Sequence, residues 1–318
     1  MSRRVASAPS ALAVALQPID ATVALRYGEP GEPGPHHADV GNREALMSTH
    51  TDTLPPMAAP RMCMLVLGTH RSGTSVTTAL VHAQGFALGG PLLHVGDENP
   101  LGHFENEQVL ALHESFLHEL GLEWFDDGDP LQLAGRQRRR RWTAAIEERF
   151  VTVAAGEDRF AVKDPRMVHL LPLWRVALRR LGTDARAIVT LRHPAATARS
   201  LHHRNDLPLA HGERIWLRDM EAIRRGIGRM RHGVVRYEHL VADPLRVLRA
   251  GFDDAGVPWQ HDAEEAMRSL VDPALNRSSA GTDVDAPHAG PLHRAIEPLR
   301  SARRWPHIDR AWPPDSVR

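Results

Sequence analysis

Glycine and hydroxyl residues are closely spaced in the segment 68–75, whose sequence is GTHRSGTS. Gly68 and Gly73 let the backbone approach a phosphate, and the free N–H groups at the start of a following helix attract an anion. A loop that hydrolyses nucleoside triphosphates needs a lysine after the second glycine, where this chain has Thr74. The spacing therefore predicts an anion site without ATP or GTP hydrolysis, unless the segment is only a tight connection. The predicted contacts are Gly68, Thr69, His70, Arg71, Ser72, Gly73, Thr74 and Ser75.

A second cationic position follows the apolar run 186–191. Arg192 ends this run, and Ser200 comes eight residues later, on a helix that Pro194 is well placed to open. An arginine makes bidentate charge-assisted hydrogen bonds and a serine adds a hydroxyl donor, so the pair favours a doubly charged phosphate over a ribose hydroxyl. The alternative is a surface ion pair for Arg192 and no ligand for Ser200.

A cation also lies inside the first loop, because Arg71 precedes Gly73 by two residues. At this point the chain resembles the sulfotransferases that use 3′-phosphoadenosine 5′-phosphosulfate (PAPS), which carry Lys or Arg here to hold the 5′-phosphosulfate. The Arg form is similar to protein-tyrosine sulfotransferases and to bacterial carbohydrate or natural-product enzymes. The spacing of Arg192 and Ser200 is similar to the family's 3′-phosphate signature. The resemblance covers about residues 62–280.

This resemblance implies transfer of a sulfuryl group from PAPS to a hydroxyl or amine, with release of adenosine 3′,5′-bisphosphate (PAP) and without a metal. By analogy with phosphoryl transfer the displacement is in line, and Arg71 stabilises the charge that builds on the leaving oxygen. Related enzymes use Glu or His from the region after the loop as a general base. Glu105 is the first candidate here, and it opens a helix predicted at 105–120. Its other possible role is to complement the helix dipole.

The remaining predicted contacts lie near the predicted base. Lys163 is the only lysine of the chain and follows a short apolar run, where α/β sheets place their ligands. With Arg166 it is expected to touch the sulfate or the acceptor, and an ion pair with Asp164 is the alternative. Residues that could bind the acceptor or replace the base are Glu98, Asp97 and His103.

Apolar periodicity predicts the elements that position these residues. Short apolar runs predict strands at 62–67, 160–162, 186–191 and 234–237. Helical spacing is found between them, at 74–84, 105–120, 138–154, 170–181 and 213–229, and after Pro194 and Asp243. This alternation predicts an α/β, P-loop-like three-layer fold with a central, mainly parallel sheet flanked by helices.

Composition limits the class of protein. The 318 residues carry 39 basic and 39 acidic side chains, so the formal net charge is zero. The chain therefore lacks the net positive charge that would favour binding to nucleic acid. The single cysteine excludes an internal disulfide, and no apolar run is long enough to span a membrane, which together suggest the cytoplasm. Pro- and Gly-rich composition predicts a disordered extension at 1–60, a sulfotransferase domain at 61–280 and a loosely ordered tail at 281–318.

Two other functions compete with this interpretation. A P-loop-type small-molecule kinase would share the first loop but lacks its lysine. A non-catalytic binding module could use the basic run 136–141, which otherwise reads as the solvated start of a helix. His113 and His118 are five residues apart, off a common helical face, so we expect surface positions and no metal. The acceptor, whether a small molecule, a carbohydrate or a peptide, would contact segments 85–135 and 201–215.

Overall fold

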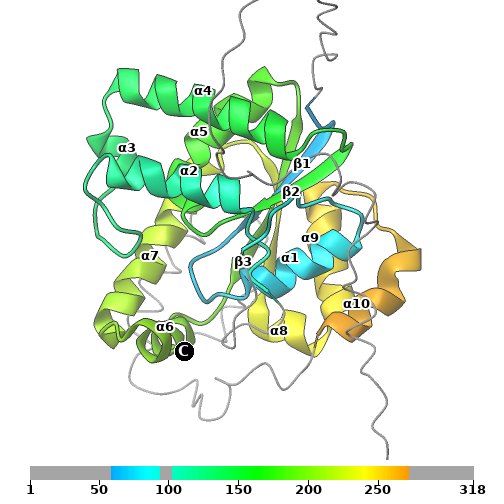
Figure 1. The fold of residues 1–318 in the computed structure, drawn as a ribbon. Coiled ribbons are helices and arrows are strands. Elements are labelled where there is room, and N and C mark those ends of the chain that lie inside the picture. Colours follow the sequence, from blue (N-terminus) through cyan, green and yellow to red (C-terminus); the bar gives the residue numbers. More distant parts are fainter. Residues whose placement is uncertain (1–58, 94–101, 272–318) are drawn as a thin grey trace, which may run out of the picture. The chain divides into compact units, whose positions relative to one another are not determined.

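The computed structural model describes residues 59–93 and 102–271. Their centre is a four-stranded sheet in the order β2-β1-β3-β4, and every neighbouring pair is parallel (Figure 1). β1 is buried from Cys63 to Leu67, as expected for a strand covered on both faces. The predicted α/β fold is therefore confirmed. The strands are β1 (Met62–Leu67), β2 (Arg159–Lys163), β3 (Asp184–Leu191) and β4 (Arg231–Arg236).

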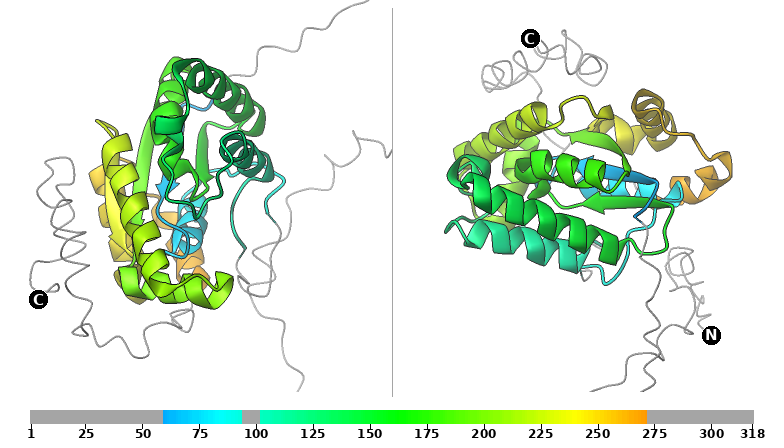
Figure 2. Two further views of the ribbon diagram at one scale, coloured as in Figure 1. Left: turned by 90° about the vertical axis from the view of Figure 1, so that its left-hand side faces the viewer. Right: turned by 90° about the horizontal axis from the view of Figure 1, so that it is seen from above.

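Helices cover both faces of this sheet, and the alternation of side chains along β1 divides the core between them (Figure 2). Cys63, Leu65 and Leu67 belong to one apolar cluster, and Met64 and Val66 belong to the other. The first cluster is completed by α2 (Glu107–His118), α4 (Arg136–Val153), α5 (Met167–Arg180) and α7 (Leu209–Gly226). The second is completed by α1 (Thr74–Ala83), α8 (Tyr237–Ala242), α9 (Pro244–Ala255) and α10 (Glu264–Leu270).

One glycine allows α9 to lie unusually close to the sheet. A Cβ on Gly233 of β4 would lie 2.1 Å from the carbonyl oxygen of Gly251 in α9. Backbone cannot yield as a flexible side chain can, so this contact requires glycine at position 233. It holds α9 against β4, the strand next to β3.

The structure agrees with most predicted elements and corrects several boundaries. The strand at 62–67 is confirmed, whereas Tyr237, predicted at a strand end, opens α8. The helix predicted from 105 begins at Glu107, because the side chain of Asn106 caps it by accepting from the N–H groups of Gln108 and Val109, at 3.0 and 3.2 Å. Three short helices, α3 (Pro130–Leu133), α8 and α10, were not predicted.

Several predicted features fall outside the described residues. These are Asp97, Glu98, most of the extension 1–60 and the whole tail 281–318, so their interpretation stays a prediction. Within residues 59–93 and 102–271, no helix combines the length and apolar character needed to cross a membrane.

Candidate functional site

The predicted site residues follow the strands at one edge of the sheet. Because β1, β2 and β3 are parallel, their carboxyl ends lie at the same edge. The loop 68–73 follows β1, the segment 163–166 ends β2, and Arg192 follows β3. Three stretches that are far apart in sequence are thereby brought together.

The loop after β1 turns sharply and presents the start of α1. Arg71 and Gly73 have φ values of 65° and 93°, and a Cβ on Gly73 would lie 2.1 Å from the ring of Tyr237. Ser72 closes the turn, since its N–H and its hydroxyl donate to the carbonyl of Thr69, at 3.2 and 2.7 Å. As far as the chain is described, the N-terminus of α1 has neither a side-chain cap nor an acidic residue in its first turn. The positive end of its dipole is left for an anion.

A buried carboxylate anchors this loop from α7. The hydroxyl of Thr69 donates to Asp219 at 2.5 Å, and His169 contacts the other carboxylate oxygen at 2.9 Å. Burial alone would raise the pKa of Asp219, but the hydrogen bond and charge of His169 and the charge of Arg218 hold it below its ordinary value. Sequence reasoning missed Asp219, although an acid on the stripe that carries Trp216 and Met220 was a usable signal.

The two predicted phosphate motifs touch each other. The guanidinium of Arg192 donates to the carbonyl of Arg71 at 2.8 Å and lies over the ring of Tyr237 at 4.7 Å. The Nε of Arg71 in turn donates to the hydroxyl of Ser200 at 3.0 Å. The sequence did not predict the contact between Arg71 and Ser200, which are 129 residues apart, or the contact of Tyr237 with Arg192, because both depend on how distant segments pack.

Arg192 is a buried cation. The alternative prediction, that it forms an ion pair at the surface, is therefore wrong. Arg192 is only 7 % exposed, and it forms no salt bridge with any carboxylate in the described part of the chain. Burial lowers the pKa of its guanidinium, which nevertheless stays charged. A buried charge is costly unless it is paired, so this arrangement suits an anionic ligand.

Lys163 and Glu105 form a second centre beside the loop. The ammonium lies 2.5 Å from a carboxylate oxygen of Glu105, 2.9 Å from the carbonyl of His103 and 3.4 Å from the hydroxyl of Ser75. Lys163 and Glu105 are 4 % and 6 % exposed. Lys163 thus pairs with Glu105 and not with Asp164. Glu105 precedes α2, which begins at Glu107, so the prediction that Glu105 opens this helix is wrong.

Asp164 belongs instead to a buried network that orients Arg166. Arg166 donates to one Asp164 oxygen at 3.0 Å, and Nδ1 of His113 donates to the other at 2.7 Å. Trp174 donates to Nε2 of His113 at 2.9 Å, so this imidazole is neutral with its proton on Nδ1. Burial would raise the pKa of Asp164, but the hydrogen bonds from His113 and Arg166 and the positive charge of Arg166 hold it well below its usual range.

His113 was therefore predicted wrongly, because it is fully buried. The neighbouring prediction for His118 agrees with the structure, since that side chain is 61 % exposed. The two histidines differ because position 113 lies on the face of α2 that packs against α5 through Trp174. A five-residue spacing puts the second imidazole on a different face of the helix.

His70 is the least satisfied polar side chain of the loop. Its ring packs against Trp124 at a tilt of 37°, with centroids 4.1 Å apart, and its Nε2 is buried without a hydrogen-bond partner among the described residues. Burial, reinforced by the charge of Arg166, lowers the pKa of His70 from 6.5 to about 3. The imidazole is therefore neutral at ordinary pH and offers an unpaired nitrogen at the edge of the site.

These groups fit a nucleotide that carries two separate phosphates. The uncapped start of α1 offers main-chain N–H donors for one, and the buried Arg192 with Ser200 offers a cation and a hydroxyl for the other. Lys163, Glu105 and His103 lie together next to Ser75 of the loop, whereas Glu98 lies outside the described residues.

A comparison with models of known protein families identifies one family. The model of a family described as "Sulfotransferase family" matches residues 64–261, more than half of the chain. No curated protein matches.

Solved structures with a similar fold include two bacterial sulfotransferases. The sulfotransferase domain of the Synechococcus PCC 7002 olefin synthase is 20 % identical, with a TM-score of 0.48, covering 77 % of this chain and 96 % of that one. Sulfotransferase STF1 of Mycobacterium tuberculosis H37Rv is 19 % identical, with a TM-score of 0.38, covering 70 % of this chain and 76 % of that one. Both TM-scores are below 0.5, so the family assignment rests on the family model.

Proposed function

Because the chain belongs to the sulfotransferase family, we propose that it transfers a sulfuryl group from PAPS to a hydroxyl or amine of an acceptor and releases PAP. The observation that carries this proposal is Arg192, a buried guanidinium without a salt bridge in the described chain, joined through Arg71 to Ser200. A 3′-phosphate is the group that distinguishes PAPS from ATP. A buried arginine with a hydroxyl beside it is suited to bind such a dianion.

The residues of the loop after β1 bind the other end of the donor. The main-chain N–H groups of Gly73, Thr74 and Ser75 hold the 5′-phosphate at the positive end of α1. The hydroxyl of Ser72 already donates to Thr69, so this side chain shapes the loop and does not bind phosphate directly. When bound, PAPS supplies a sulfuryl group attached to a phosphate leaving group.

Four charged side chains take part in the transfer. Arg71 stabilises the negative charge that develops on the departing phosphate oxygen. Glu105 accepts the proton of the acceptor, and Lys163, which lies 2.5 Å from it, holds this carboxylate in place and stabilises negative charge on the sulfuryl oxygens. Arg166, oriented by Asp164, contacts the acceptor or the sulfate.

The alternative of a small-molecule kinase is less well supported. Thr74 stands where a triphosphate-binding loop needs its lysine, and the only lysine of the chain is paired with Glu105.

The acceptor and the compartment are part of the same proposal. The acceptor of the proposed reaction is a small molecule, a carbohydrate or a peptide. The single cysteine supports a reducing compartment such as the cytoplasm.

The test is turnover of PAPS. Purified protein is incubated with PAPS and a panel of phenol, sugar, amine and tyrosine-peptide acceptors, and release of PAP and formation of sulfated product are measured. Acceptor-dependent release that Arg71→Ala abolishes would support the proposal. Phosphorylated product from ATP with magnesium, together with no turnover of PAPS by the folded protein, would contradict it and favour the kinase.

A further inference from the structure

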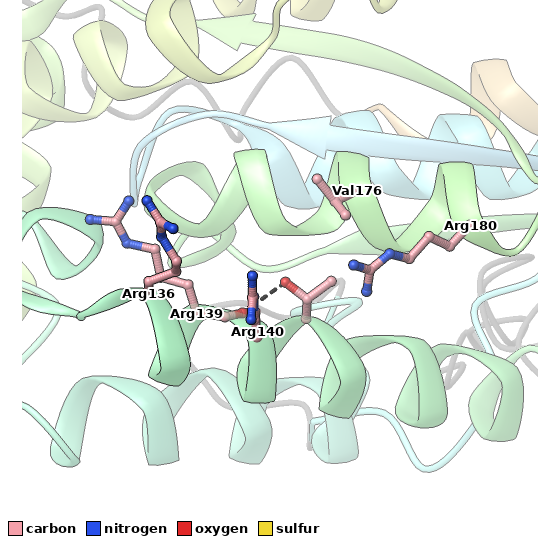
Figure 3. A pocket seen from close by; sticks show the side chains of 6 residues that line it. Arg136, Arg139, Arg140, Val176 and Arg180 are labelled. Carbon is pink, nitrogen blue, oxygen red and sulfur yellow. Dashed lines mark hydrogen bonds between the residues drawn. The ribbon is translucent and has the colours of Figure 1, made fainter.

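A basic hollow of about 430 Å³ lies between α4 and α5 (Figure 3). Arginines from both helices surround it, and none of its lining residues is acidic. None belongs to the loops after β1, β2 or β3 that form the site described above. The lining residues are Arg136, Arg139, Arg140, Thr143, Val176 and Arg180.

The arginines at the start of α4 divide between two faces of the helix. Arg138 and Arg141 both contact the single carboxylate of Glu119, which follows the end of α2. Positions 136, 139, 140 and 143 follow the three- and four-residue spacing of one helical face, and this face lines the hollow. The split leaves one set of charges paired and the other directed to a concave surface.

The charges of the hollow are only partly satisfied. Neither Arg136 nor Arg140 forms a salt bridge with a carboxylate of the described chain. Arg139 donates through Nε to the carbonyl of Ala134 at 2.7 Å, which fixes its guanidinium, and Arg180 pairs with Glu147 at 2.9 Å. The hollow therefore carries a clear excess of positive charge.

The arginines of the hollow destabilise α4, the helix on which most of them lie. The first turn of a helix favours acidic side chains, yet α4 has none there and begins with Arg136. Arg136 and Arg140 are also like charges four residues apart, which repel each other on a helix surface. An anion bound in the hollow would offset both effects.

A second hollow provides an internal comparison, because it is similar in size and also contains arginine. It measures about 400 Å³, and its lining includes Arg246 and Arg249 but also Asp253 and Glu264. Its charges balance. The excess at the α4–α5 hollow is therefore a local property and does not follow from the high arginine content of the chain.

We propose that the hollow between α4 and α5 binds a small anion that carries two or more phosphate or sulfate groups. Its volume is in the range of small-molecule sites, and guanidinium groups bind phosphate and sulfate oxygens bidentately. The chain has no net charge, so a concave local site suits a compact anion better than a nucleic acid, which would need an extended basic surface. The proposal is independent of the proposed sulfuryl transfer.

The test is calorimetric titration with sodium tripolyphosphate. The full-length chain carries Arg71→Gln and Arg192→Gln throughout, so that the cofactor loops contribute little. In this background we expect one binding event. Adding Arg136→Gln and Arg140→Gln should weaken it at least 10-fold. The matched control is Arg229→Gln with Arg249→Gln, which removes the same charge from exposed positions elsewhere and should leave the affinity unchanged.

Two further titrations separate the possible ligands, and circular dichroism confirms that each variant is folded. If ATP binds as tightly as tripolyphosphate, the hollow recognises the phosphates alone. If ATP binds more tightly than tripolyphosphate, the hollow also contacts the nucleoside. No binding of tripolyphosphate, or equal weakening by the control pair, would overturn the proposal. Binding of a single-stranded oligonucleotide that depends on Arg136 and Arg140, without binding of tripolyphosphate, would overturn it in favour of nucleic acid.

Discussion

Most charged groups at the edge of the sheet are buried with a partner. Asp219 is paired with His169, Asp164 with Arg166, and Lys163 with Glu105. Breaking such a pair leaves an uncompensated charge, which costs about 3–5 kcal/mol in a buried site. Arg192 differs, because it has no carboxylate partner within the described chain, and its partner in the proposed function is the ligand.

Glu105 can be tested by comparison with a neighbouring glutamate. Glu105→Gln removes the proposed base, and we expect kcat for sulfuryl transfer to fall by about 100-fold or more. Glu107→Gln, at an exposed position two residues away, should leave kcat unchanged. Steady-state kinetics on any accepted substrate measures both. Unchanged kcat in folded Glu105→Gln would show that another group removes the proton.

His70 should make stability depend on pH. Its folded pKa of about 3 is below the unfolded value of 6.5, so the unfolded chain binds the proton first as the pH falls. The stability associated with neutral His70 is complete above pH 6.5 and is lost as the pH falls toward 3, by up to about 1.4 kcal/mol per pH unit.

Urea unfolding between pH 7 and pH 4.5 measures this effect. We expect the free energy of unfolding of His70→Gln to fall less steeply with decreasing pH than that of the wild type. Other buried groups such as His193 contribute equally to both proteins and cancel in the comparison. Parallel pH curves would show that His70 titrates normally in the folded protein.

At the scale of elements, apolar periodicity located the strands of the described sheet, but the bounds of β2, β3 and β4 differ from the predicted 160–162, 186–191 and 234–237. β1 was predicted with its observed bounds because an uninterrupted apolar run ends at Gly68. The short helices α3, α8 and α10 were not predicted, since four to seven residues are too few to show a helical period. The start of α2 was missed because the capping contacts of Asn106 are local and do not alter the apolar pattern.

The candidate site was predictable only as separate segments. Arg71, Arg192 and Ser200 were each identified, but their mutual contacts depend on the β1–β3 pairing and the position of α6 (Pro194–Asn205). His113 and Asp219 were not assigned to the site. Their partners lie on other helices, and the spacing within a single helix does not reveal such a partner.

The packing of α9 against β4 gives a prediction at this scale. Gly233→Ala places a Cβ against the backbone of Gly251, and we expect a loss of about 1–3 kcal/mol or more in the free energy of unfolding. Gly251→Ala is the matched control, because its Cβ would meet only the side chains of Val235 and Ile188, at 3.0 and 3.3 Å. Chemical denaturation compares the two. Equal losses would show that the close backbone approach does not limit the packing.

At the scale of the whole molecule, 39 basic and 39 acidic residues cancel, so anions are bound by local arrangements and not by an overall positive field. Two such arrangements stand out in the described chain: the edge of the sheet with Arg71 and Arg192, and the hollow between α4 and α5. The first is the basis of the proposed function.

The most direct test of the central claim is the calorimetric affinity for PAP compared with AMP, which lacks the 3′-phosphate. We expect PAP to bind at least 10-fold more tightly than AMP, and Arg192→Ala to remove most of this preference while leaving AMP binding nearly unchanged. ADP, and ATP with magnesium, serve as further comparisons and should bind more weakly than PAP. Equal affinity for PAP and AMP, or a preference for ATP with magnesium, would contradict the assignment of Arg192 and Ser200 to the 3′-phosphate and with it the PAPS-dependent function.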